Sequence, residues 1–230
     1  MNLARRILSK VIHVFLTRIS RFHKERGTIF MFHDVGGDDS YSFNITVDEF
    51  KIFLDKISSR KVVPLSDMYK QEDGCFITFD DVPSSFYKNA YPILQEKKIP
   101  FTLFIATDLI GKDGFLSQAQ IIELAKSPLC TVGSHGISHR MFYKKNKKEF
   151  LEELIESKLK LEQLINKEVE FFAFPYGSYF ACGYRYKSLV LKYYKYGFST
   201  INATLSSSKL FKKYFLPRIN VSHEFINEFK

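Results

Sequence analysis

The chain has 230 residues, 45% of them hydrophobic, and a formal net charge of +9. This length fits one α/β domain, and the hydrophobic content is ample for its core. Residues 1–26 hold seven Lys or Arg against one acidic side chain, so they carry +6 and the remainder only +3. A nearly balanced body is not the uniformly basic footprint of a nucleic-acid-binding protein, and we expect no nucleic-acid partner.

The basic segment 1–26 has the pattern of an amphipathic helix. Its apolar residues share one helical face: Ala4, Ile7, Leu8, Val11, Ile12, Phe15, Ile19 and Phe22. Its longest apolar stretch, Val14–Leu16, is far shorter than the ~7–15 residues of a secretory signal core. Two interpretations stay open, contact with an anionic membrane surface and packing against the body. We expect a cytoplasmic protein without signal peptide or transmembrane helix, peripheral on the inner membrane face if the first interpretation holds.

From residue 27 onward, short apolar runs alternate with amphipathic stretches. Strands are predicted at Thr28–His33, Val62–Pro64, Cys75–Phe79, Phe101–Ala106, Cys130–Val132, Phe171–Phe174, Phe198–Ile201 and Phe215–Val221. Helices are predicted from Thr46 to Ser58, Ser84 to Lys97 with a bend at Pro92, Ser117 to Lys126, Asn146 to Asn166 and Tyr184 to Tyr196. This alternation favours parallel βα units closed into a barrel, forming one domain over 27–230. The three cysteines, an odd number, indicate reduced thiols.

Two pairs of polar side chains follow predicted buried strands. Asp80 and Asp81 end the run Cys75–Phe79, and His135 and His139 follow Cys130–Val132. Two imidazoles and one carboxylate fill three positions on a divalent cation and leave one open for water. The second carboxylate can then act as a base. Helix capping and ordinary loop histidines are the alternative, but the carboxyl ends of barrel strands are where catalytic side chains collect.

These segments resemble the polysaccharide deacetylases, carbohydrate esterase family four. The resemblance rests on Thr78–Asp81, His135–His139 and Phe174–Gly177, and it extends over roughly residues 29–221. It implies a distorted barrel of about seven strands. It also implies that Asp81, His135 and His139 bind the metal and that Asp80 is the catalytic base. The backbone N–H of Tyr176 would stabilise the oxyanion; the alternative role, an exposed ring that stacks on a sugar, is compatible with the first.

The departing amine needs a general acid, and two histidines follow predicted strands at the two ends of the domain. His33 lies in Met31–Val35, a segment similar to one in biofilm poly-N-acetylglucosamine deacetylases, whose acid histidine is on the N-terminal strand. We therefore favour His33 over His223. Asp34, directly after it, together with any carboxylate near the mouth of the barrel, is expected to favour the imidazolium and raise the pKa of His33.

Three departures from the family pattern concern residues near the motifs. Ala173 stands where many members have an Arg that orients the base, Val82 stands where Gly commonly follows the Asp pair, and the chain contains no Trp. These departures leave the predicted metal ligands unchanged. They concern which substrate is bound and how the catalytic base Asp80 is oriented and its pKa set.

The predicted function is a metal-dependent hydrolase that removes N-acetyl groups from an acetamido sugar in a glycan or glycan precursor. The expected cofactor is one divalent cation, Zn²⁺ in first place with Co²⁺ or Ni²⁺ as alternatives, and the expected partner is an N-acetylated glycan. Alternatives are an O-acetyl esterase or another amide hydrolase with the same centre, and a catalytically silent carbohydrate-binding domain.

Overall fold

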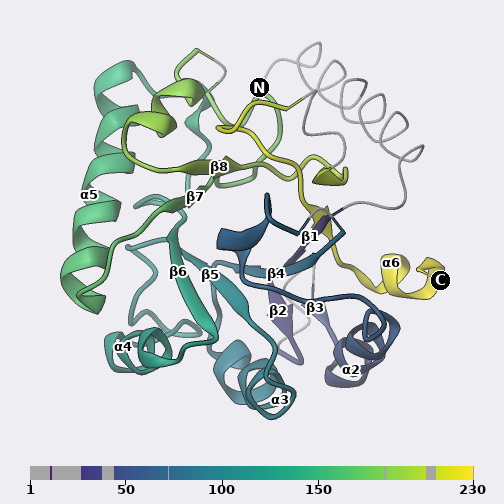
Figure 1. The fold of residues 1–230 in the computed structure, drawn as a ribbon. Coiled ribbons are helices and arrows are strands. Elements are labelled where there is room, and N and C mark those ends of the chain that lie inside the picture. Colours follow the sequence, from purple (N-terminus) through teal and green to yellow (C-terminus); the bar gives the residue numbers. More distant parts are fainter. Residues whose placement is uncertain are drawn as a thin grey trace.

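A curled sheet with helices on its outer side forms the domain (Figure 1). The computed structural model describes residues 11, 27–37, 44–71, 73–183, 185–205 and 211–229. The amphipathic helix expected over 1–26 therefore lies outside the described residues, Val11 excepted. Among the residues described, no helix is both long enough and apolar enough to cross a membrane.

Seven parallel strands make up the main sheet, as predicted. They are β1 (Thr28–Phe32), β4 (Cys75–Asp80), β5 (Phe101–Ile105), β6 (Cys130–Ser134), β7 (Phe171–Ala173), β8 (Tyr196–Phe198) and β9 (Ile219–Asn220). Their order in the sheet is β8-β7-β6-β5-β4-β1-β9, and every pairing is parallel. The parallel barrel-like fold is thereby confirmed. A separate pair, β2 (Asp34–Val35) and β3 (Asn44–Ile45), follows β1.

The stretch 213–221 connects the two ends of the sheet. Its first part pairs with the β8 end through the bridge between Phe198 and Leu216, where Leu216 N–H donates to Gly197 O at 2.8 Å. Its second part is β9, which pairs with β1. The strand expected over Phe215–Val221 is thus shorter than predicted, because the chain changes partner midway. The residue at that change is Arg218, whose N–H donates to Ile201 O at 3.0 Å.

The helices cover the outer side of the sheet (Figure 1). They are α2 (Val47–Lys56), α3 (Tyr91–Glu96), α4 (Gln118–Lys126), α5 (Lys147–Ile165) and α6 (His223–Glu228), with short helical turns η1 (Leu65–Asp67), η2 (Phe86–Ala90), η3 (Phe142–Lys144) and η4 (Lys187–Lys192). Capping boxes begin α2, α4 and α5 at Thr46, Ser117 and Asn146, so these three predicted helix starts are confirmed.

Two predicted helices differ from the structure. The one expected from Ser84 to Lys97 is continuously helical over 84–96, but it contains a π-helical turn, η2, directly before α3, and Pro92, which lacks an N–H, follows that turn. The one expected over 184–196 is reduced to η4, because the chain must be extended at Tyr196 to pair with Phe171 in β7. Tertiary pairing overrides the local helical preference here. The short strand at Val62 is only a bridge to Cys75.

Alternation along β4 divides its side chains between two sides of the sheet. Ile77 and Phe79 belong to the large cluster that includes α2 and α3 residues such as Phe50 and Leu94, whereas Phe76 belongs to a second cluster with Phe104 and Phe198. Thr78 and Asp80 have the parity of Phe76 and so point into the barrel. The three cysteines are free thiols, and burial raises the pKa of Cys75 to about 11 and that of Cys130 to about 12.

Candidate active site

The paired carboxylates lie where β4 ends. On a continuing strand, Asp80 and Asp81 would point to opposite sides. Asp81 and Val82 instead have φ of 60° and 51°, and Val82 N–H donates to Asp80 O at 2.6 Å in a tight turn. This left-handed backbone, costly for a β-branched residue, turns both carboxylates toward the same side. Val82 therefore adopts a conformation that the Gly common at this position would adopt without strain.

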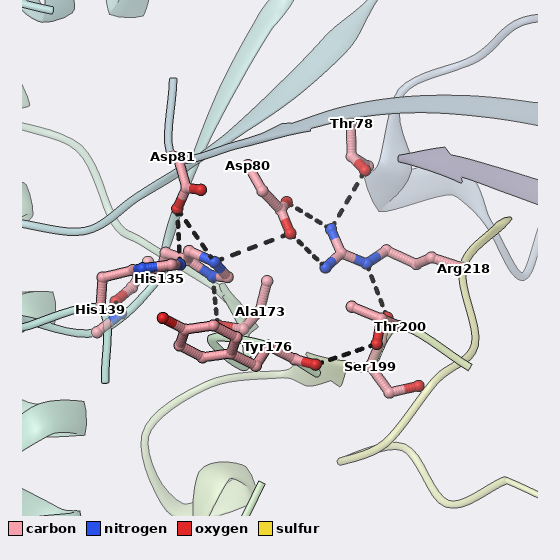
Figure 2. Close-up of polar contacts among 12 residues, drawn as sticks. Thr78, Asp80, Asp81, His135, His139, Ala173, Tyr176, Ser199, Thr200 and Arg218 are labelled. Atoms are coloured by element: carbon pink, nitrogen blue, oxygen red, sulfur yellow. Dashed lines mark hydrogen bonds and ion pairs between the residues drawn. The ribbon is translucent and has the colours of Figure 1, made fainter. Parts of the chain in front are cut away.

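The two imidazoles come from the end of β6 and the loop after it. His135 is buried, and its Nδ1 lies 2.8 Å from Ala173 O (Figure 2). Because a carbonyl oxygen only accepts, Nδ1 carries the proton, and the lone pair of Nε2 faces Asp81. His139 follows with φ of 50°, and its Nε2 lies 2.9 Å from Asp81 Oδ1.

Asp81, His135 and His139 form a group that fits a divalent cation. One ligand atom from each lies within 4.8 Å of the others. Asp81 Oδ1 is buried without a well-aligned hydrogen-bond donor, which a cation would compensate. Burial raises the pKa of Asp81, but the nearby imidazoles of His139 and His135 outweigh it and hold that pKa at about 2. Burial lowers the pKa of His135, which favours the neutral form that a metal ligand needs.

Asp80 stands beside this group and is held by Arg218. Arg218 Nη1 and Nη2 each donate to one oxygen of the Asp80 carboxylate at 2.7 Å, and both side chains are buried. Arg218 Nε donates to Ser199 O at 3.0 Å, which fixes the guanidinium (Figure 2). Asp80 Oδ2 is 3.9 Å from His135 Nε2. Burial raises the pKa of Asp80, but the charge of Arg218, helped by its hydrogen bonds, outweighs burial, so that pKa is lowered and the carboxylate is ionised at neutral pH.

Arg218 was not predicted as a site residue from the sequence. At the position where many family members have the base-orienting Arg, Ala173 offers its carbonyl to His135, and Arg218 contacts Asp80 from the other end of the sheet. The sequence feature that could have indicated Arg218 is its position as the one basic residue in the largely apolar run Phe215–Val221. Charged residues in such runs are almost never buried unless paired.

Tyr176 lies at the edge of the metal group. Its φ is 60°, its side chain is 51% exposed, and its ring centroid is 5.1 Å from that of His139. Within the described part of the chain, its N–H donates no hydrogen bond, while its carbonyl accepts from Ser178 N–H at 2.5 Å and from Thr200 Oγ1 at 3.2 Å. Among the described residues the N–H thus has no acceptor, and the ring is exposed to solvent.

The two candidate acid histidines lie in different places. Burial lowers the pKa of His33, with Asp80 and Asp81 opposing, so His33 is within electrostatic range of the site. The expectation of a raised pKa was wrong: the carboxylates that favour the imidazolium are Asp80 and Asp81, not Asp34, which accepts a hydrogen bond from Ser85, and burial outweighs them. His223 begins α6 with a 69% exposed side chain and pairs with Glu49 and Asn227; no described contact joins it to the site.

Comparisons with known proteins agree with this geometry. A family model described as polysaccharide deacetylase matches residues 68–197. A poly-beta-1,6-N-acetyl-D-glucosamine N-deacetylase of Staphylococcus epidermidis is 29% identical, over 82% of this chain and 72% of that protein. A polysaccharide deacetylase structure from Bacillus cereus aligns with a TM-score of 0.75 at 22% identity, covering 86% of this chain and 65% of that one. A Streptococcus pyogenes deacetylase solved in complex with acetate aligns with a TM-score of 0.74 at 21% identity, covering 89% and 97%. The two solved structures share the fold.

Proposed function

We propose that this chain, which belongs to the polysaccharide deacetylase family, is a metal-dependent hydrolase that removes N-acetyl groups from an acetamido sugar in a glycan or glycan precursor. The observation that carries the proposal is the ionised Asp80 held by Arg218 directly beside the three candidate ligands Asp81, His135 and His139. A base next to a cation site with room for a water molecule is the arrangement by which a metal-dependent enzyme hydrolyses an amide.

The substrate class follows from the curated relative. That protein is named for poly-β-1,6-N-acetyl-D-glucosamine, and it is similar to this chain over most of both lengths. We propose the same class here, a polymer or oligomer of N-acetylglucosamine.

Zn²⁺ is the proposed cation, with Co²⁺ and Ni²⁺ as alternatives, because two imidazole nitrogens and one carboxylate oxygen suit all three. When bound, such a cation would lower the pKa of a water molecule and polarise the acetamide carbonyl. His135 is prepared as a ligand by its hydrogen bond to Ala173 O, which leaves Nε2 unprotonated.

The remaining residues have separate roles in the proposed reaction. Asp80 accepts the proton of the attacking water, for which its lowered pKa keeps it ionised at neutral pH. The N–H of Tyr176 donates to the oxygen that becomes negative as the carbonyl carbon turns tetrahedral. His33, half-buried within electrostatic range of Asp80 and Asp81, is the proposed proton donor to the departing amine: burial lowers its pKa, and the charges of the two carboxylates oppose that and favour the imidazolium that the role needs.

Two further readings use the same residues. An O-acetyl esterase would need the same base and cation but would depend less on a general acid, because an alkoxide leaves more easily than the nitrogen anion that an unprotonated amine would have to leave as. A silent carbohydrate-binding domain has no use for a buried ionised carboxylate clamped beside a cation site, since keeping it costs desolvation.

The location remains part of the proposal. We propose a cytoplasmic protein that contacts an anionic membrane through residues 1–26, whose seven Lys or Arg accompany one apolar helical face.

Acetate release tests the activity. The protein is incubated with a β-1,6-linked N-acetylglucosamine oligomer, an O-acetylated and N-unacetylated oligomer of the same length, and a β-1,4-linked N-acetylated oligomer. We expect acetate and new primary amine in equal amounts from an N-acetylated oligomer, abolished by a chelator and restored by Zn²⁺. Release from the O-acetylated oligomer alone would replace the proposal by the esterase.

A further inference from the structure

The loop 136–139 that carries His139 is not part of a helix or strand. Gly136 and His139 both have positive φ, 77° and 50°. Its backbone is tied to the β5 side by Thr107 N–H to Gly136 O and Asp108 N–H to Ile137 O, both at 3.0 Å. A left-handed backbone conformation at a His costs free energy, and it persists only where contacts with the surrounding structure hold it.

Glu153, on the buried side of α5, collects the donors of this loop. Its side chain is 5% exposed. Oε2 accepts from the N–H of Ile137 at 2.6 Å and of Ser138 at 3.2 Å, and Oε1 accepts from Ser138 Oγ at 2.5 Å. Lys145 Nζ adds an ion pair at 2.8 Å. One carboxylate thus joins the central residues of the loop to a long helix.

Gly136 makes this approach possible. A Cβ added there would lie 2.9 Å from Glu153 Oε2, closer than real Cβ contacts, and its φ also favours Gly. Burial lowers the pKa of His139, but Asp81 and Asp80, followed by Glu153, outweigh it and raise that pKa. Glu153 therefore lies within electrostatic range of the ligand as well as in contact with its loop.

We propose that Glu153 is a positioning residue for the cation site: it fixes the loop 136–139 so that His139 Nε2 faces Asp81 before any cation binds. This inference rests on the proposed function, because it assigns to Glu153 a role in binding the cation that the reaction would use. Outer residues that orient a ligand typically contribute 10–100-fold to metal affinity.

The test measures Zn²⁺ affinity of the metal-free full chain by competition with a chromophoric chelator. Glu153→Gln is expected to weaken Zn²⁺ binding by about 10–100-fold. Glu156→Gln, an exposed change of the same charge on the same helix, is the matched control and should bind as wild type. The melting temperature of each metal-free protein shows whether it folds. Ser138→Ala, which removes one of the donors to Glu153, is the milder second variant and should weaken binding in the same direction.

A double variant separates positioning from general support of the fold. With His139→Ala present, adding Glu153→Gln should weaken Zn²⁺ binding little further, because Glu153 acts through His139. Unchanged affinity in folded Glu153→Gln would overturn the inference, and if that variant does not fold, unchanged affinity in Ser138→Ala would do so. If wild type binds none of Zn²⁺, Co²⁺ and Ni²⁺, the proposed function itself is overturned.

Discussion

Arg218 donates two parallel hydrogen bonds to the carboxylate of Asp80, each 2.7 Å long. The two side chains are 0% and 1% exposed, respectively. They come from β4 and from the stretch that connects the two ends of the sheet, 138 residues apart in the chain. Closure of the barrel and orientation of the proposed base therefore depend on the same short segment.

Removing the guanidinium should change the pH dependence of the reaction. Because Arg218 lowers the pKa of Asp80, Arg218→Met should raise it, and the acidic limb of the kcat/KM profile should move to higher pH. The buried carboxylate also loses its partner, at a cost of about 3–5 kcal/mol in the free energy of unfolding. Arg218→Lys keeps the charge and should shift the limb less. A uniform loss of activity with an unmoved acidic limb would argue against Asp80 as the base.

The acid assignment predicts different effects for the two histidines. His33→Ala should lower kcat by about 10²–10⁴-fold with the metal retained, because the amine then leaves without a positioned proton donor. His223→Ala should have little effect on kcat, since that side chain pairs with Glu49 on the surface. With aryl acetates, whose leaving oxygen needs little protonation, the His33→Ala defect should shrink. A larger loss in His223→Ala, together with this rescue, would transfer the role to His223.

Glu153 should make stability depend on pH. Burial raises its pKa, but the hydrogen bonds from Lys145, Ser138 and Ile137 outweigh burial and lower it from 4.5. A lowered folded-state pKa means that the stabilisation is fully present above pH 4.5 and is lost as pH falls through the folded pKa. The difference in melting temperature between wild type and Glu153→Gln should therefore be largest near neutral pH and diminish below pH 4.5. A difference that stays constant down to pH 3 would show that charge plays no part in the contact.

Deleting residues 1–26 should abolish binding to anionic vesicles while acetate release from a soluble oligomer stays unchanged. The physical reason is that apolar burial and Lys/Arg attraction act together at an interface. A chain with the same 26 residues in scrambled order keeps the charge but not the apolar face, and it should bind more weakly than wild type. Vesicle binding by the truncated protein equal to that of the full chain would rule the anchor out.

The sequence predicted those parts of the site that are contiguous in the chain. Asp80 and Asp81 end a recognisable strand, and His135 and His139 follow another, so strand polarity alone brings them to one end of the sheet. The helix starts at Thr46, Ser117 and Asn146 were predictable because a capping box is local chemistry.

The parts that depend on distant contacts were not predictable. Arg218 reaches Asp80 only because the chain changes from pairing with β8 to pairing with β1 at that residue. Glu153 looks like any other acidic residue of an amphipathic helix until α5 packs beneath the loop 136–139. The pKa of His33 was predicted in the wrong direction because its burial and the hydrogen bond between Asp34 and Ser85 are tertiary features.

The metal content of purified Asp80→Asn tests the division of roles most directly. If Asp81, His135 and His139 hold the cation and Asp80 only accepts a proton, this variant retains the wild-type ratio of metal to protein while acetate release is lost. His139→Ala, measured in parallel, should have little metal. An Asp80→Asn protein with an empty site would make Asp80 a ligand and contradict the assignment.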